Sequence, residues 1–282
     1  MTVMITGANG FSGRYLSSAI SEDKVLVTRE GETQCSKSNC SYHCDLLDFE
    51  KVSEMIRNIK PTRIYHLAGS FTNDYNTDHE SNVLTTKNIL DAVYKYSSSA
   101  RVLLIGSAAE YGLVSKENCP VAESSSLRPF SIYGLTKINQ KTIMDYYVNT
   151  KSLDIVMARP FNLYGKGISS RLFIGKVYQE INSLKNGDVD KISLGNLDSE
   201  RDFISIENAV KHYIRIMEKG IVGEVYNVAS GKSIKIKDIL SRILEEEHLD
   251  FNVVNANSRS EQTNDSDIIY ADITKLKGLY NE

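Results

Sequence analysis

Short runs of aliphatic and β-branched residues alternate with longer stretches of helical period over the first 160 residues. This alternation is typical of βαβ units and predicts an α/β fold with a doubly wound parallel sheet, a Rossmann fold. The predicted strands are Val3–Thr6, Lys24–Thr28, Tyr42–Cys44, Arg63–His66, Arg101–Ile105 and Asp154–Arg159. The helices predicted between them are Phe11–Ile20, Asp48–Ile59, Glu80–Tyr96 and Ser131–Tyr147.

The pattern becomes less regular after Pro160, with helices predicted at Leu172–Leu184, Ile206–Glu218 and Ile236–Glu246 and short strands between them. We therefore expect a Rossmann domain over residues 1–160 and a smaller α/β lobe over residues 161–282, with elements that cross this boundary. Open α/β sheets bind ligands at their carboxyl edge, which the lobe is expected to cap. The polar stretch NANSRSEQTNDSD, residues 255–267, is expected to be a loop that either closes over a ligand or is simply mobile.

Composition and charge narrow the classes of function. The chain has 282 residues, 41% of them hydrophobic, and a net charge of -3 without a long Lys/Arg block, which argues against a nucleic-acid partner. It shows no signal-peptide pattern and no apolar run of roughly 18 residues, so we expect a cytoplasmic protein without membrane contact. The four cysteines lack metal-ligand spacing, so we expect reduced thiols and no metal site.

The stretch ITGANGFSGRYL places Gly7, Gly10 and Gly13 between the first strand and the first helix. Glycine permits the tight turn and the close approach that a pyrophosphate needs, and the helix N-terminus offers free N–H groups. This position favours a dinucleotide site over a merely structural turn.

The end of the second strand helps to choose the cofactor. An acidic residue there suits the ribose hydroxyls of NAD, whereas a cation suits the 2′-phosphate of NADP. Thr28 and Arg29 stand at this end, with Arg14 as a second candidate cation, and they favour NADP(H). Glu30 keeps NAD(H) open. Asp45 is expected to hold the adenine together with its neighbour in the sequence, or else to cap the next helix.

Tyr133 and Lys137 are four residues apart on a predicted helix, so their side chains share one face. An ammonium beside a phenol favours the phenolate, so we expect the pKa of Tyr133 to fall from about 10 toward the working pH. Such a pair suits proton transfer. The alternative for an isolated pair of this kind is a surface contact without a role.

These motifs, together with HLAG at His66–Gly69, Asn82 at a helix and Ser107 after a central strand, resemble the extended short-chain dehydrogenase/reductase family. The resemblance covers essentially the whole chain. It implies that Tyr133 exchanges a proton with a substrate oxygen, that Lys137 holds the nicotinamide ribose, and that Ser107 hydrogen-bonds the reacting carbonyl. The cofactor-binding set that it implies is Gly7, Gly10, Phe11, Gly13, Arg29, Asp45, Leu46, Leu67, Ala68, Tyr133 and Lys137.

ARPFNLYGKG, ERDFISIENAV and GEVYNVASG, in the second half of the chain, are similar to stretches of nucleotide-sugar enzymes in this family. The resemblance implies a nucleotide-diphospho-sugar substrate, with Asn162 and Arg201 at the diphosphate and the nucleotide. An ion pair with Glu200 or Asp202 is the alternative role of Arg201. The substrate-binding residues expected from the resemblance are Glu110, Asn162, Arg171 and Arg201.

Ala108 and Ala109 follow Ser107 where sugar dehydratases of the family place a carboxylate and epimerising reductases place a cysteine. Methyl groups transfer no protons, so the site is expected to pass a hydride and one proton, which is the requirement for reducing a 4-keto group without epimerisation at C3 or C5. Glu110 is expected to bind a hydroxyl or to stabilise its loop rather than to act as an acid.

The resemblance is greatest to the reductases that act on GDP-4-keto-6-deoxy-mannose, although LYGKG, which follows Asn162, departs from their pattern and leaves hexose and heptose substrates open. Two alternatives remain: a UDP-hexose 4-epimerase with retained NAD, and a non-catalytic NADP-sensing protein. The helices predicted at Glu80–Tyr96 and Ser131–Tyr147 resemble the pair that forms a four-helix homodimer interface in the family.

Overall fold

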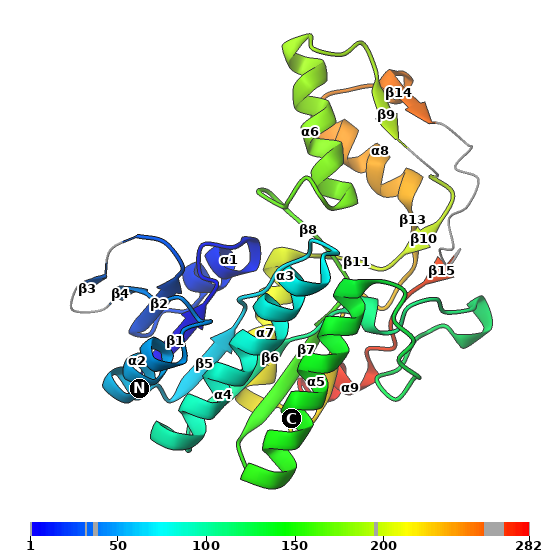
Figure 1. Cartoon of the computed structure of the whole chain (residues 1–282). Helices are drawn as coiled ribbons and strands as arrows, with labels where there is room; N and C mark the ends of the chain where they lie inside the picture. The colour runs from blue at the N-terminus through cyan, green and yellow to red at the C-terminus, as the bar shows by residue number, and fades with distance from the viewer. Residues whose placement is uncertain (1, 32, 36–38, 195–196, 257–267, 282) are drawn as a thin grey trace.

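The computed structural model describes residues 2–31, 33–35, 39–194, 197–256 and 268–281. Its centre is an eight-stranded sheet in the order β12, β7, β6, β5, β1, β2, β4, β3 (Figure 1). Seven strands are parallel, and β3 pairs antiparallel with β4 at the edge, which confirms the predicted doubly wound α/β fold. The strands are β1 (Val3–Thr6), β2 (Lys24–Thr28), β3 (Gln34–Cys35), β4 (Asn39–His43), β5 (Arg63–His66), β6 (Arg101–Ile105), β7 (Ile155–Pro160) and β12 (Val225–Val228).

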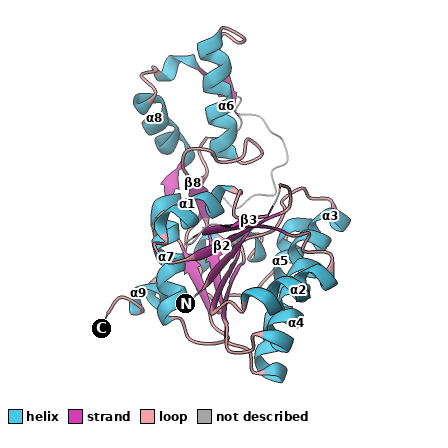
Figure 2. Ribbon diagram, turned by 90° about the vertical axis from the view of Figure 1, so that its left-hand side faces the viewer, coloured by secondary structure: helices cyan, strands magenta, loops and turns pink. Residues whose placement is uncertain are grey.

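Helices cover both faces of this sheet (Figure 2). Successive side chains of a strand point to opposite faces, so Met4 belongs to one hydrophobic core while Val3 and Ile5 belong to the other. The core that contains Met4 is closed by α2 (Phe49–Ile59), α4 (Thr85–Tyr96) and α5 (Ile132–Lys151). The opposite core is closed by α1 (Phe11–Ala19), α7 (Ile206–Lys219) and α9 (Thr274–Gly278).

The helix predicted at Glu80–Tyr96 begins earlier than its hydrophobic pattern suggested. Asp74 accepts a hydrogen bond from the N–H of Thr77 and starts a short helix, α3 (Tyr75–His79). A π-helical turn, Glu80–Leu84, joins α3 to α4. The ends of the other predicted helices lie within a few residues of the observed ends.

The chain leaves the sheet after β7 and later returns to it, since α7 and β12 belong to the main layers and β12 pairs with β7. A separate lobe stands above the carboxyl edge of the sheet (Figure 1). Its core is formed by α6 (Phe173–Asn186), α8 (Ile236–Glu246), β9 (Ile192–Leu194) and β14 (Val254–Ala256). The connections form two small sheets, from β8 (Asn162–Tyr164) and β11 (Phe203–Ser205), and from β10 (Glu200–Arg201), β13 (Ile234–Lys235) and β15 (Ile268–Ile269).

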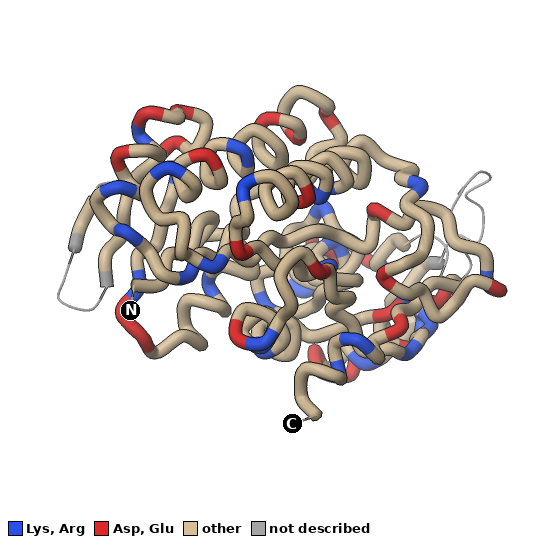
Figure 3. Tube along the Cα trace, turned by 90° about the horizontal axis from the view of Figure 1, so that it is seen from below, with Lys and Arg blue, Asp and Glu red and all other residues tan. Residues whose placement is uncertain are grey.

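Three short turns complete the described structure: η2 (Ala108–Glu110), η3 (Lys116–Asn118) and η4 (Phe251–Val253). Most of the predicted polar loop, residues 257–267, lies outside the described residues. No helix in the described part of the chain is long and apolar enough to span a membrane. Lys and Arg are interspersed with Asp and Glu along the trace (Figure 3).

The cysteines differ in their state. Cys44 and Cys119 are free thiols, as expected, and burial raises the pKa of Cys44 to about 11. Cys40 is disulfide-bonded, so the expectation of reduced thiols is wrong for this residue. Among the described residues, no group of three or more His, Cys, Asp or Glu side chains has an arrangement suited to a metal ion.

Candidate active site

The glycine turn after β1 leaves no room for side chains. Gly7 has a φ of +66°, and a Cβ there would lie 2.7 Å from the backbone nitrogen of Ala68. A Cβ on Gly13 would lie 2.3 Å from the carbonyl oxygen of Gly7. Gly10 is the N-cap of α1 and brings no side chain to its first N–H groups. The turn therefore offers backbone donors at a helix N-terminus, which fits a pyrophosphate.

A pocket of about 200 Å³ opens beside this turn at the carboxyl ends of β1, β2, β4 and β5. It brings together the predicted cofactor residues Gly7, Arg29, Asp45, Leu46 and Ala68. Asp45 also accepts a hydrogen bond from the N–H of Leu47. The size of the pocket, apolar lining residues such as Leu46 and the cation Arg29 suit the adenosine half of a dinucleotide. Leu67 lies beside the pocket rather than in its lining, with its backbone against Gly7.

Arg14 does not join this pocket. Its guanidinium donates to the carbonyl oxygens of Asn9 at 3.0 Å and Gly167 at 3.3 Å. Tyr15 donates to the carbonyl of Lys166 at 2.9 Å. Its position on α1 turns Arg14 toward the segment that follows β8, and its role as a second cation for the cofactor stays a prediction.

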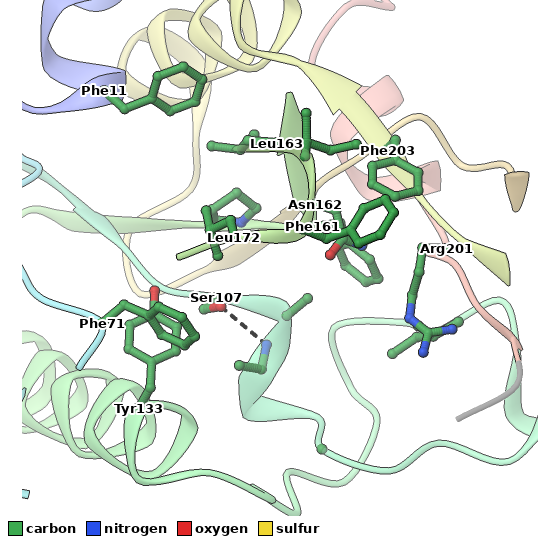
Figure 4. Close-up of a pocket in the computed structure, with 17 residues that line it drawn as sticks. Phe11, Phe71, Ser107, Tyr133, Phe161, Asn162, Leu163, Leu172, Arg201 and Phe203 are labelled. Atoms are coloured by element: carbon green, nitrogen blue, oxygen red, sulfur yellow. Dashed lines mark hydrogen bonds between the residues drawn. The ribbon is translucent and has the colours of Figure 1, made fainter. Parts of the chain in front are cut away.

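A larger pocket of about 400 Å³ lies between the sheet edge and the lobe. Ser107 and Tyr133 face each other on one side of it, and Arg201 lies at the other end (Figure 4). Phe11, which was predicted to contact the cofactor, lines this pocket rather than the smaller one. The lining comprises Phe11, Phe71, Ser107, Ala108, Ala109, Gly112, Tyr133, Pro160, Phe161, Asn162, Leu163, Leu172, Phe173, Ile174, Arg201, Phe203 and Ile269.

Tyr133 stands in the first turn of α5, which begins where the hydroxyl of Ser131 accepts a hydrogen bond from the N–H of Gly134. Burial raises the pKa of Tyr133 to about 12, while a hydrogen bond with Ser107 acts in the opposite direction. The expected lowering of this pKa is wrong for this structure, because burial outweighs the other contributions. The phenol is therefore protonated at neutral pH.

Lys137 lies one turn further along α5 and is buried. Its ammonium donates to the carbonyl of Ile105 at 2.9 Å and to Oε1 of Gln140 at 3.2 Å. It lies 5.8 Å from the centroid of the Tyr133 ring. Burial lowers the pKa of Lys137 to about 8. The predicted pair therefore shares one face of the helix, and the ammonium lies over the ring of Tyr133.

Glu110 lies outside the pocket, contrary to its predicted contact with substrate. Its Oε1 accepts a hydrogen bond from the N–H of Ser107 at 2.8 Å. Its Oε2 accepts two from the guanidinium of Arg159, at 2.6 and 3.0 Å. Both side chains are fully buried. The carboxylate stabilises the loop that carries Ser107, which is the structural alternative that the sequence left open.

Asn162 and Arg201 line the pocket as expected. Asn162 donates to the carbonyl of Asp202 at 2.9 Å, and Arg201 donates to the carbonyl of Glu200 at 2.8 Å. The carboxylate of Asp202 accepts hydrogen bonds from the N–H and the hydroxyl of Ser230 and from the N–H of Gly231. Arg171 is exposed and does not line the pocket, because the turn before α6 directs Leu172 and Phe173 inward instead.

The chain is similar to known proteins. A family model described as "NAD dependent epimerase/dehydratase family" matches residues 3–229. The chain belongs to this family. The chain is 25% identical over 259 residues to GDP-6-deoxy-D-mannose reductase of Pseudomonas aeruginosa, covering 89% of this chain and 82% of that protein. It is 28% identical over 252 residues to GDP-6-deoxy-D-talose 4-dehydrogenase of Aggregatibacter actinomycetemcomitans, covering 87% and 80%.

A solved structure has the same fold. The structure of RMD from Pseudomonas aeruginosa complexed with NADPH superposes with a TM-score of 0.85 at 23% identity, covering 99% of this chain and 91% of that one. A fold alone does not determine the reaction, so the function must be argued from the side chains of the site.

The apolar wall of the pocket was missed by the sequence analysis. Phe71 packs edge-on against the ring of Tyr133, with 4.9 Å between the centroids. Phe173, Phe203 and Ile269 come from the lobe and its connections. Of these residues, only Phe71 could have been predicted from the sequence as part of a binding pocket. It follows HLAGS at the carboxyl end of β5, where ligand-binding residues gather in open sheets.

Proposed function

We propose that this protein is an NADPH-dependent reductase that converts a GDP-linked 4-keto-6-deoxy sugar to the 4-hydroxy sugar. The observation that carries the proposal is the set of polar side chains in the larger pocket. In the described part of the chain, the residues that line this pocket include four with polar side chains: Ser107, Tyr133, Asn162 and Arg201. Of these, only Tyr133 is suited to donate a proton at neutral pH to a substrate carbonyl.

The two positions after Ser107 support this reaction over its relatives. Ala108 and Ala109 line the pocket with methyl groups. Elimination of water, or inversion at C3 and C5, needs a further acid or base near the ring. Glu110, the nearest carboxylate in the sequence, is turned into an ion pair with Arg159. The site is equipped to protonate one oxygen.

The chain's own residues perform the proton half of the reduction. The 4-keto oxygen is placed between the hydroxyls of Tyr133 and Ser107, and both donate hydrogen bonds to it. The hydroxyl oxygen of Ser107 also accepts the N–H of Ala109 at 3.2 Å, which fixes its orientation. As the carbonyl is reduced, the Tyr133 proton passes to the oxygen, and the Lys137 ammonium stabilises the phenolate until solvent reprotonates it.

The cofactor would be held along the glycine turn, with its pyrophosphate at the N-terminus of α1 and its adenosine half beside Arg29 and Asp45. When bound, NADPH supplies the hydride that is added to C4. Arg29 lines the smaller pocket and supports NADPH over NADH, because a guanidinium pairs with a 2′-phosphate. The third N–H of Lys137, beyond those donated to Ile105 and Gln140, is left for the nicotinamide ribose.

The shape of the pocket supports the choice of substrate. Arg201 and Asn162 lie at the end away from Tyr133 and would take the diphosphate (Figure 4). Phe71 lies beside Tyr133, where it offers an apolar surface to the groups next to C4. A 6-deoxy sugar presents a methyl group there, which an aromatic ring accommodates better than a hydroxymethyl group. The guanine base is supported by the two GDP-sugar relatives.

We also propose a homodimer through α4 and α5, which lie next to each other on one face of the sheet (Figure 1). Large apolar side chains are exposed on both helices, including Tyr94 on α4 and Leu135 and Tyr146 on α5. Light scattering at micromolar concentration should give twice the mass of one chain, and the double substitution of Leu135 and Tyr146 by Asp should give the mass of one chain. A wild-type monomer contradicts this proposal.

NADPH oxidation against GDP-, UDP- and dTDP-linked 4-keto-6-deoxy sugars tests the reaction. Turnover should be greatest with a GDP-linked substrate, and Tyr133→Phe should lower kcat by about 100-fold or more, in the range of general acid catalysis. Tyr280→Phe, at an exposed tyrosine that follows α9 and lies outside the pocket and the proposed interface, is the control. Tightly held NAD with interconversion of UDP-hexoses, and no oxidation of NADPH, would instead support a 4-epimerase.

A further inference from the structure

Hydrogen bonds between buried side chains run without interruption from the end of β1 to the ammonium of Lys137. Oγ1 of Thr6 lies 2.8 Å from Nδ1 of His66, and Nε2 of His66 lies 3.1 Å from Oγ1 of Thr86. The amide of Gln140 donates to Thr86 at 2.8 Å and accepts from Lys137 at 3.2 Å. All five side chains are buried.

The donor and acceptor of each bond are determined. Lys137 has only donors, so Gln140 must turn its oxygen to the ammonium and its NH₂ to Thr86. The hydroxyl of Thr86 donates to the carbonyl of Asn82 at 2.8 Å, so its oxygen accepts from both Gln140 and His66. His66 therefore carries its proton on Nε2. A reversal of the Gln140 amide would place two donors against each other at Lys137.

This arrangement orients the ammonium. Lys137 and Gln140 are three residues apart on α5 and face the same side of the helix. Two of the three N–H bonds of Lys137 point to fixed acceptors, the carbonyl of Ile105 and the Gln140 amide. The direction of the third N–H bond follows from these two. Gln140 is itself held by Thr86, which α4 supplies.

We propose that Gln140 is a positioning residue for Lys137: its amide, anchored through Thr86 to the His66 and Thr6 chain, aims the ammonium at the cofactor ribose. This inference rests on the proposed function, in which Lys137 binds the ribose and stabilises the Tyr133 phenolate. Gln140 touches neither substrate nor cofactor in this account and acts through Lys137 alone.

The charges around Lys137 determine how a substitution of Gln140 changes the pKa of Lys137. Glu110 on η2 and Asp78 on α3 favour its charged form, while burial opposes it. Neutral His66 on β5 and the Tyr133 ring on α5 also face it. Replacing the Gln140 amide by a carboxylate adds a charge in contact with the ammonium, whereas an aliphatic side chain removes an acceptor. These two changes must move the pKa of Lys137 in opposite directions.

The test uses protein labelled with [ε-13C]lysine, with Lys137→Arg to assign the resonance. In the full chain without cofactor, Gln140→Glu should raise the pH midpoint of Lys137 by about one pH unit or more, and Gln140→Leu should lower it. Asn149→Glu adds the same charge to an exposed position of α5 and should leave the midpoint at its wild-type value. A common direction for both Gln140 variants, or no movement in either, overturns the proposal. If the Leu variant does not fold, Gln140→Met replaces it.

Cofactor binding supplies the second readout. Gln140→Leu should weaken NADPH binding, followed by fluorescence, by about 10-fold, in line with the loss of one oriented charge-assisted hydrogen bond. Gln140→Glu, which keeps an acceptor, should stay within about 3-fold of wild type. Unchanged NADPH affinity in Gln140→Leu overturns the positioning role. The pH midpoints of Lys137 could move as expected while the protein reduces no keto sugar. That result would overturn the proposed function but would still support the positioning of Lys137 by Gln140.

Discussion

Glu110 and Arg159 form an ion pair at 2.6 Å in the interior, with 0% and 1% of their side chains exposed. The second Glu110 oxygen receives the N–H of Ser107, so one carboxylate joins a strand of the main sheet to the loop of the candidate active site. Arg159 also donates to the hydroxyl of Tyr111 at 2.8 Å. Glu110, which follows the two alanines, therefore stabilises the loop that carries Ser107 and does not line the pocket.

Glu110→Gln should lower the free energy of unfolding by about 3–5 kcal/mol, because Arg159 is left without its buried counter-charge. Urea denaturation measures this loss, with exposed Glu117→Gln as the control. Activity per folded molecule should fall by less than about 10-fold, since general acid catalysis is worth 100-fold or more. If Glu110→Gln has wild-type stability but no turnover, Glu110 is instead a catalytic group.

His66 should make stability depend on pH. Burial lowers the pKa of His66 from 6.5 to about 3, so between these values only the unfolded chain gains the proton. The free energy of unfolding therefore decreases as the pH falls from 6.5, by about 1.4 kcal/mol per pH unit from this one group.

His66→Gln keeps an NH₂ group where Nε2 donates but does not titrate, so its stability curve should be flatter than that of wild type by this slope. Urea denaturation at several pH values between 6.5 and 4.5 measures the difference. His248→Gln removes an exposed histidine and should follow the wild-type slope. Parallel curves for His66→Gln and wild type would contradict the neutral buried histidine.

Arg29 should determine the choice between NADPH and NADH. Arg29→Glu should raise the KM for NADPH by about 10- to 100-fold, as expected from losing a charge-assisted hydrogen bond to the 2′-phosphate, and should change the KM for NADH much less. Arg14→Gln is the matched control, because Arg14 is bonded to Asn9 and Gly167 and should leave the ratio of the two constants unchanged. A ratio that responds to Arg14 and not to Arg29 would contradict the assignment.

The residues that the sequence located correctly are those whose position depends on local geometry. Gly7 and Gly13 lie at a strand-to-helix turn, and Ser107 follows a strand that is buried on both faces. Tyr133 and Lys137 are related by helical spacing. For such residues, the period of the element and its end determine where the side chain lies, so no knowledge of the packing is needed.

The errors concern residues whose direction depends on distant partners. Glu110 was predicted to bind the substrate because the sequence does not show that Arg159, on the next strand of the sheet, is its partner. In the same way, nothing in the local sequence of Arg14 indicates its hydrogen bond to the carbonyl of Gly167. The lowered pKa expected for Tyr133 considered a neighbouring charge and omitted burial, which is known only once the chain is folded.

Reduction of GDP-4-keto-6-deoxy-mannose with NADPH in D₂O, followed by NMR of the isolated sugar product, tests the central claim most directly. The pocket that we describe passes a hydride to C4 and one proton to its oxygen. The product should therefore carry protium at C4, delivered from NADPH, and no deuterium at C3 or C5. Deuterium at either of these carbons, formed during turnover, would show that the pocket holds a further base and would contradict the account.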